Sequence, residues 1–234
     1  MSVANLCEYK WGCRALLSPW VNPKTGKLQV WGRGNCGVES LNLPYIAMEN
    51  NNEHSEEVLF KNLDHYLNIA YQDMIWRINH VAKIKAKACP LLWVYGGMAR
   101  LNPEDSLEKL VYGGFYTCTL GYSGLYECVK YITGENHWEG NGKILAHKIL
   151  DYLNEKNKKF GEKINVSIAL YGTPSESLTD TFAKACLRDF GQVGDGTQRK
   201  YLTNSYHIPV FQKIDAFNKL TNEAQFSDKT QGGE

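Results

Sequence analysis

The sequence predicts an α/β fold in which short parallel strands alternate with helices. The chain of 234 residues is 43% hydrophobic and 12% aromatic, so it can bury a sizeable core. Short runs dense in Val, Leu, Tyr and Thr are typical of strands, and a loop and a helical run follow them. This alternation of strand, loop and helix favours α/β layers with parallel strands.

Residues 1–37 show no helical periodicity and are rich in Gly, Trp, Asn and Pro. Asn22-Pro23-Lys24-Thr25-Gly26 is a turn sequence between two short extended runs, Arg14–Leu17 and Leu28–Trp31. We therefore predict a long loop or hairpin. A loop of this length with little structure of its own is uncommon unless it is functional.

A long helix follows, because apolar residues recur every three or four positions from Leu59 to Val81. Ser55 is the expected N-cap, and two acidic residues occupy the first turn. Cys89-Pro90 is the expected end, since proline restricts the residue before it.

The remaining elements follow the same alternation. Strands are predicted at Pro90–Val94, Val111–Leu120 and Val166–Tyr171. Helices are predicted after Gly124, from Lys143 to Phe160, and after Gly172 up to a C-cap at Gly191. Tyr201–Val210 is predicted as a last short strand with a loop inside it, and residues 222–234 as a polar tail.

Charge and cysteine usage limit the function classes. With 26 Lys and Arg against 25 Asp and Glu, a net charge of +1 does not favour binding of nucleic acid or membranes by bulk electrostatics. No apolar run approaches the ~20 residues of a membrane helix, and Met1–Arg14 lacks the pattern of a signal peptide. Seven cysteines without a C-x-x-C pair favour a reducing cytoplasm and no metal site in this chain.

Two short motifs are interpreted as structural. Gly32–Gly37 matches G-x-G-x-x-G, but a dinucleotide fingerprint needs a helix within those glycines, and Val38–Leu43 has an extended pattern. Gly121-Tyr122-Ser123-Gly124 is similar to a nucleophile elbow, but Leu125 stands where the final glycine is required.

Thr173-Pro174-Ser175-Glu176 has the pattern of a helix N-terminus. Thr173 suits the N-cap, Pro174 suits N1, and Glu176 at N3 completes a capping box. The segment follows a strand and Gly172, so its free backbone N–H groups can also face an anion. Ligands in open α/β folds collect beyond the carboxyl ends of strands. A well-capped helix and an anion site both stay open.

Six segments, taken together, identify a family resemblance. They are Trp11-Gly12-Cys13-Arg14, Gly32–Val38, Leu41–Ala47, Leu120–Leu125, Tyr171–Ser177 and Tyr201–Val210. In their order and spacing the chain resembles the large subunit of the anaerobic, class III, ribonucleotide reductases. The resemblance implies part of the ten-stranded α/β barrel that these enzymes share with glycyl radical enzymes, with a finger loop through its centre.

The resemblance also implies which residues carry the chemistry. Cys13 matches the finger-loop cysteine that becomes a thiyl radical and abstracts the 3′ hydrogen of the ribose. Such a radical must be held in contact with that carbon and away from water. Asn35 matches an asparagine that hydrogen-bonds substrate hydroxyls, although an αL turn residue among glycines is an alternative.

Two sets of substrate-binding residues are implied as well. Those expected to hold the substrate phosphates are Gly172, Thr173, Ser175 and Glu176. Those expected to line the same cavity are Asn204, Ser205 and His207. For Asn204-Ser205, ordinary turn chemistry is the alternative.

Several parts of the family are not matched: an N-terminal ATP-cone region, a second active-site cysteine, a zinc-binding cysteine quartet and a glycyl radical loop. We therefore expect a fragment. Residues 1–37 would be the finger loop, residues 38–221 an α/β half-barrel, and residues 222–234 a polar tail.

The expected function is that of a fragment, inactive alone, of an enzyme that reduces ribonucleoside triphosphates to deoxyribonucleoside triphosphates by radical chemistry. The resemblance implies a glycyl radical made by an iron-sulfur and S-adenosylmethionine activase, formate as reductant, and a zinc site, none of them bound by this chain. The expected partners are the triphosphate substrate, the cone region, the glycyl radical domain and the activase, with no membrane and no direct nucleic acid.

Two alternatives remain. One is another glycyl radical enzyme of the same barrel, such as a pyruvate formate-lyase relative, but that group pairs adjacent cysteines and Cys13 stands between Gly12 and Arg14. The other is a non-catalytic assembly or regulatory fragment that binds the rest of the reductase.

Overall fold

The computed structural model describes residues 10–11, 15–17, 20–22, 25–29, 33–174 and 176–230. The strands are β1 (Lys10–Trp11), β2 (Ala15–Leu16), β3 (Asn35–Asn42), β4 (Thr117–Ser123) and β5 (Ser167–Gly172). The helices are α1 (Leu43–Met48), α2 (Glu56–Ala82), the 3-10 turn η2 (Ala86–Ala88), α3 (Pro90–Trp93), α4 (Glu108–Val111), α5 (Leu125–Thr133), α6 (Gly140–Ile164), α7 (Glu176–Phe190), α8 (Gly194–Arg199) and α9 (Ala216–Ser227).

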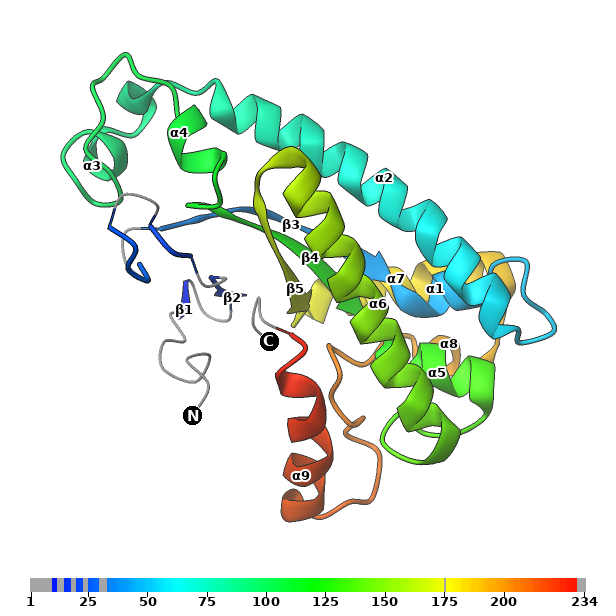
Figure 1. Ribbon diagram of the computed structural model, residues 1–234. Helices are drawn as coiled ribbons and strands as arrows, with labels where there is room; N and C mark the ends of the chain where they lie inside the picture. The colour runs from blue at the N-terminus through cyan, green and yellow to red at the C-terminus, as the bar shows by residue number, and fades with distance from the viewer. Residues whose placement is uncertain are drawn as a thin grey trace.

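Strands β3, β4 and β5 form a parallel sheet in that order. The predicted parallel α/β arrangement is therefore confirmed. Helices α1, α2, α3 and α4 and the turn η2 lie between β3 and β4 in the chain, and helices α5 and α6 lie between β4 and β5. Figure 1 shows α2 and α6 crossing the same face of the sheet, while β1 and β2 lie on the other side.

The two faces of the sheet differ in chemistry. Side chains alternate along a strand, and Leu41, Leu120 and Leu170 point into the core beneath the helices. On the opposite face, Ser40 and Thr173 lie close to Gly121. A parallel sheet buried on both faces is normally apolar on both, so this small, hydroxyl-bearing face suits a polar occupant.

The N-terminal hairpin is found where the turn sequence predicts it. Val21 bridges Leu28 in antiparallel fashion, and the Asn22 N–H donates to the Lys27 carbonyl at 2.9 Å. The Gly26 N–H donates to the Asn22 carbonyl at 2.8 Å. The predicted boundary of this region, between residues 37 and 38, falls inside β3.

Helix α2 begins as predicted, because the Ser55 hydroxyl accepts a hydrogen bond from the Val58 N–H. It ends at Ala82 rather than at Cys89. The cause is tertiary: the fully buried Ala86 donates its N–H to the Asp105 carbonyl at 2.9 Å, so the chain leaves the helix to pack there.

Two predicted strands are wrong in whole or in part. Residues Pro90–Trp93 form the short helix α3, in which the fixed φ of Pro90 suits the first position. The next strand begins at Thr117, not at Val111, because α4 and two glycines with positive φ, Gly113 and Gly114, come before it.

The C-terminal elements also differ from prediction. Residues Tyr201–Val210 contain no strand, and the isolated bridge between Asn204 and Ser123 is the ladder pairing that the described residues show between this segment and the sheet. The predicted polar tail from residue 222 is wrong in its first part, because α9 runs through it to Ser227. Asp215 caps this helix, and Phe226 anchors it with a fully buried ring.

No helix in the described part of the chain is long and apolar enough to cross a membrane.

Candidate functional site

A pair of hydroxyls marks the carboxyl edge of the sheet. Ser40, near the end of β3, and Thr173, just after β5, are hydrogen-bonded through their side-chain oxygens at 2.9 Å. Gly121 of β4 lies between them. A Cβ atom there would stand 2.2 Å from Thr173 Oγ1 and 2.5 Å from Ser40 Oγ, so only glycine lets the two hydroxyls meet.

The backbone after β5 is held to the end of β4. The Thr173 N–H donates to the Tyr122 carbonyl at 3.0 Å, and the Ser123 hydroxyl donates to the Thr173 carbonyl at 3.5 Å. Asn204 bridges Ser123 from the other side. Three segments far apart in sequence therefore converge on this edge, which is where ligands bind in open α/β sheets.

Ser205 is the most unusual residue of this edge. Its side chain is fully buried, its backbone is left-handed with φ at 52°, and its Oγ has no hydrogen-bond partner among the described residues. The buried Asn204 Oδ1 likewise has no partner there. Buried polar atoms are almost always paired, so two such atoms in consecutive residues call for a further polar partner, such as a water molecule or a ligand group.

Gly172 makes room for Ser205. A Cβ atom on Gly172 would stand 1.9 Å from Ser205 Oγ and 2.8 Å from Ser205 Cβ. Gly172 was expected to hold the substrate phosphates, and in the structure its missing side chain leaves room for the 203–206 segment.

Glu127, on α5, supports this segment from behind. Its carboxylate is buried, and Oε1 accepts from both the N–H and the hydroxyl of Thr203, at 2.8 and 2.7 Å. Burial raises the pKa of Glu127 to about 7, although the bonds from Thr203 oppose the shift. The sequence analysis missed this residue. Its signal was an acid between Tyr126 and Cys128 in an apolar helical run.

His207 is held by an acid on α9. His207 Nδ1 lies 3.4 Å from Glu223 Oε2, and the Ile208 N–H donates to Glu223 Oε1 at 2.8 Å. Burial alone would raise the pKa of Glu223, but these two partners lower it. A cavity of about 490 Å³ borders Asn204, His207 and Glu223.

Asn35 lies at the other end of the sheet. It opens β3, five residues before Ser40, which is roughly 17 Å along an extended strand. Its amide oxygen accepts from the Gly37 N–H at 2.7 Å, and its amide nitrogen donates to the Thr119 hydroxyl. The structure thus pairs Ser40 with Thr173 and packs Ser205 against Gly172, but it brings Asn35 to neither contact.

Three predicted site residues are described in part or not at all. Cys13 and Ser175 lie outside the described residues. Glu176 is the first residue of α7, two residues later than the predicted start at Pro174. Thr173 is therefore not the N-cap, and its hydroxyl pairs with Ser40 instead.

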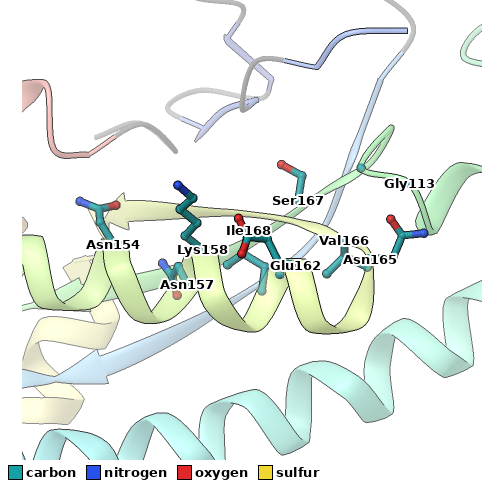
Figure 2. Close-up of a pocket in the computed structure, with 11 residues that line it drawn as sticks. Gly113, Asn154, Asn157, Lys158, Glu162, Asn165, Val166, Ser167 and Ile168 are labelled. Atoms are coloured by element: carbon teal, nitrogen blue, oxygen red, sulfur yellow. The ribbon is translucent and has the colours of Figure 1, made fainter. Parts of the chain in front are cut away.

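A second cavity, of about 530 Å³, lies between α6 and β5, and Figure 2 shows Asn157 and Lys158 of α6 beside Ser167 of β5. It contains none of the predicted site residues. Asn157 is buried there, and its Oδ1 accepts from the Tyr71 hydroxyl at 3.0 Å. This cavity flanks the start of β5 instead of the carboxyl ends of the strands, so we place the candidate site elsewhere.

Within residues 33–174 and 176–230, and in the shorter described stretches before them, no three His, Cys, Asp or Glu side chains are grouped to hold a metal ion.

The fold and the polar edge define a class: an α/β protein with neutral polar groups gathered beyond the carboxyl ends of parallel strands, as in proteins that bind anionic ligands. The family model described as anaerobic ribonucleoside-triphosphate reductase matches residues 4–234. The chain belongs to this family.

Curated relatives agree. The chain is 33% identical over 225 residues to the anaerobic ribonucleoside-triphosphate reductase of Escherichia coli K12, covering 95% of this chain and 31% of that protein. It is 30% identical to the enzyme of phage T4, covering 95% of this chain and 36% of that one. The chain thus spans about a third of these relatives.

Solved structures show the same fold. The anaerobic ribonucleotide reductase of Thermotoga maritima with citrate in the active site matches with a TM-score of 0.63 at 19% identity, over 86% of this chain and 35% of that one. The same enzyme with dATP and CTP matches with a TM-score of 0.63, over 89% and 32%. The predicted membership in the reductase barrel fold is confirmed.

Proposed function

We propose that this chain is the part of an anaerobic ribonucleoside-triphosphate reductase that binds the substrate phosphates and carries the radical cysteine, Cys13. The observation that supports phosphate binding is the Ser40–Thr173 hydroxyl pair at the carboxyl edge of the sheet, where Gly121 leaves room for both hydroxyls. Hydroxyl donors in a dry pocket bind an anion more strongly than they bind water.

The remaining predicted residues fit one orientation of the substrate. Phosphates at the carboxyl edge, near Gly172, Thr173, Ser175 and Glu176, would leave the nucleoside along the hydroxyl-bearing face of the sheet. That face leads toward Asn35, which would orient the ribose hydroxyls. His207, held by Glu223, would border the same edge.

In this proposal Cys13 abstracts the 3′ hydrogen of the ribose as a thiyl radical and later returns a hydrogen. The radical source is a glycine of another part of the reductase, activated by an iron-sulfur and S-adenosylmethionine enzyme. Formate, the zinc site, the cone region and a cytoplasmic location belong to the same proposal. Because the chain spans about a third of its relatives, the fragment alone should not reduce nucleotides.

Phosphate binding is tested by Thr173→Val, which keeps the shape and removes the hydroxyl. In isothermal titrations with ATP, CTP and tripolyphosphate, the variant should bind each ligand at least about tenfold more weakly than the wild type does. This is the effect of losing one hydrogen bond to a charged group. Thr181→Val, on the exposed face of α7, is the matched control and should bind as the wild type does. Equal affinities in both variants would contradict the phosphate site.

Radical chemistry is tested by Cys13→Ala. The chain is produced together with the remaining segments of the reductase, and deoxyribonucleotide formation is measured without oxygen. We expect no product from Cys13→Ala. The control Cys128→Ala, at a fully buried core thiol, should lower stability by about 1 kcal/mol and retain turnover. Turnover by Cys13→Ala would refute its role as the radical cysteine.

A further inference from the structure

Two cysteines face each other across the first two strands of the sheet. Asn35 pairs with Thr117 and Val38 pairs with Thr119, so the register shifts between these positions. Cys36 and Gly37 together therefore oppose the single residue Cys118, the pattern of a β-bulge. Adjacent strands lie about 4.8 Å apart, within the Cα separation that a disulfide tolerates.

The two thiols are free, and each shifts the pKa of the other. Both side chains pack in the same apolar cluster under the N-terminal half of the sheet, with Met74 and Ile78 of α2.

The two thiols differ in exposure. Cys36 is partly exposed, whereas Cys118 is 2% exposed. Cys36 is therefore the more accessible residue of the pair. A partly exposed thiol beside a buried second thiol is the arrangement of a peroxide-sensing pair.

The charges around the pair favour a thiolate at Cys36. The neighbouring Cys118 thiol lowers the pKa of Cys36 most, burial opposes this shift, and the Arg77 guanidinium on α2 lowers the pKa further. Arg77 lies over the bulge, since a Cβ on Gly37 would stand 2.1 Å from its Nη1. Glu39 and Asp73 are the acids nearby, and both are ion-paired to Arg77, at 2.6 and 3.5 Å.

We propose that Cys36 and Cys118 form a reversible oxidation site that a hydroperoxide converts to an intramolecular disulfide. The Cys36 thiolate attacks one peroxide oxygen, the O–O bond breaks, and hydroxide leaves, which yields a sulfenic acid. The Cys118 sulfur then attacks the Cys36 sulfur, the S–O bond breaks, and water leaves with the Cys118 proton. Two thiols and one hydrogen peroxide thus give a disulfide and two waters, and a dithiol reductant reverses the change.

The disulfide would fix the bulge. Asn35 adjoins Cys36, and its side-chain oxygen accepts a hydrogen bond from the Gly37 N–H. A disulfide at Cys36 would therefore restrain the same stretch of backbone that orients the Asn35 amide. This site is independent of the carboxyl edge and of the proposed phosphate binding.

The test uses the reduced chain treated with hydrogen peroxide without denaturant, blocked with N-ethylmaleimide and digested for mass spectrometry. We expect one linked pair of peptides, joining Cys36 to Cys118, that dithiothreitol separates. Cys118→Ala should stop at the sulfenic acid, trapped at Cys36 by dimedone. Cys36→Ala should leave Cys118 reduced, and Cys89→Ala, the control, should form the disulfide as the wild type does.

A second measurement uses the wild-type chain alone, so it does not depend on whether the variants fold. In the wild-type chain, Cys36 should react with peroxide at least about tenfold faster than the buried Cys128 and Cys186, because only a reachable thiolate reacts. Equal rates for the three thiols would overturn the proposal. A peptide linking Cys36 to Cys13 or to Cys89 instead of Cys118 would overturn it as well.

Discussion

Gly172→Ala is expected to lower the free energy of unfolding by about 3 kcal/mol, the upper range for inserting a methyl group into a packed site. The added Cβ would stand 1.9 Å from Ser205 Oγ and 2.8 Å from Ser205 Cβ, and the fully buried Ser205 has no space to retreat. Urea denaturation followed by circular dichroism measures the loss.

The double variant Gly172→Ala with Ser205→Gly is expected to regain most of this stability. Glycine removes both contact atoms and suits the left-handed φ of 52° at position 205. The two substitutions should therefore couple by more than about 1 kcal/mol. Gly134→Ala, where a Cβ meets nothing within 4 Å, is the control and should lose only the ~1 kcal/mol of its left-handed backbone. Additive effects at positions 172 and 205 would contradict the close contact.

Glu127→Ala is expected to lower the free energy of unfolding by about 3 kcal/mol. It removes the acceptor of two buried hydrogen bonds and leaves the Thr203 N–H without a partner in an apolar site. The 203–206 segment should loosen first, so hydrogen exchange should show lost protection at Thr203 and Ser205 before the sheet opens.

Glu127 should also make stability depend on pH. Its pKa is about 7 in the folded chain, above the ordinary value of 4.5, so the folded state holds its proton more tightly. The free energy of unfolding should therefore be highest below about pH 4.5 and fall as the pH rises to about 7, by at most about 3 kcal/mol. Glu127→Gln, which cannot ionise, should flatten this fall and be more stable than the wild type near pH 8.

Urea denaturation at several pH values from about 5 to 8 measures this slope. Glu155→Gln, at an exposed carboxylate paired with Lys159, is the control and should keep the wild-type slope. If Glu127→Gln kept that slope too, Glu127 would not be the group that titrates.

Sequence pattern was sufficient wherever local chemistry decides the structure. The apolar periodicity from Leu59 to Val81 correctly predicted α2, and Ser55 correctly predicted where the helix begins. The run Val166–Tyr171 predicted β5, and the run Val111–Leu120 predicted β4 in part, although β4 continues through Gly121–Ser123, where a turn was expected. The order of the motifs predicted the family. Local patterns worked here because capping and periodicity depend on residues within one or two turns.

Sequence pattern failed where distant contacts decide. Pro90–Trp93 has the composition of a strand, but no strand among the described residues pairs with it, and Trp93 Nε1 donates instead to the Tyr116 hydroxyl at 2.7 Å. The polar segment near residue 222 stays helical because Phe226 is buried. Composition does not reveal a partner that lies far away in the chain.

For the candidate site, the sequence by itself determined the family, the α/β order and a set of polar residues that follow strand ends. Only the tertiary structure decided which of them meet: Thr173 with Ser40 across Gly121, and Ser205 against Gly172. The tertiary structure also places Asn35 at the opposite end of the sheet and brings Glu127 into contact with Thr203. The reason is that parallel register sets which strand ends adjoin, and a buried carboxyl can be recognised only by what surrounds it.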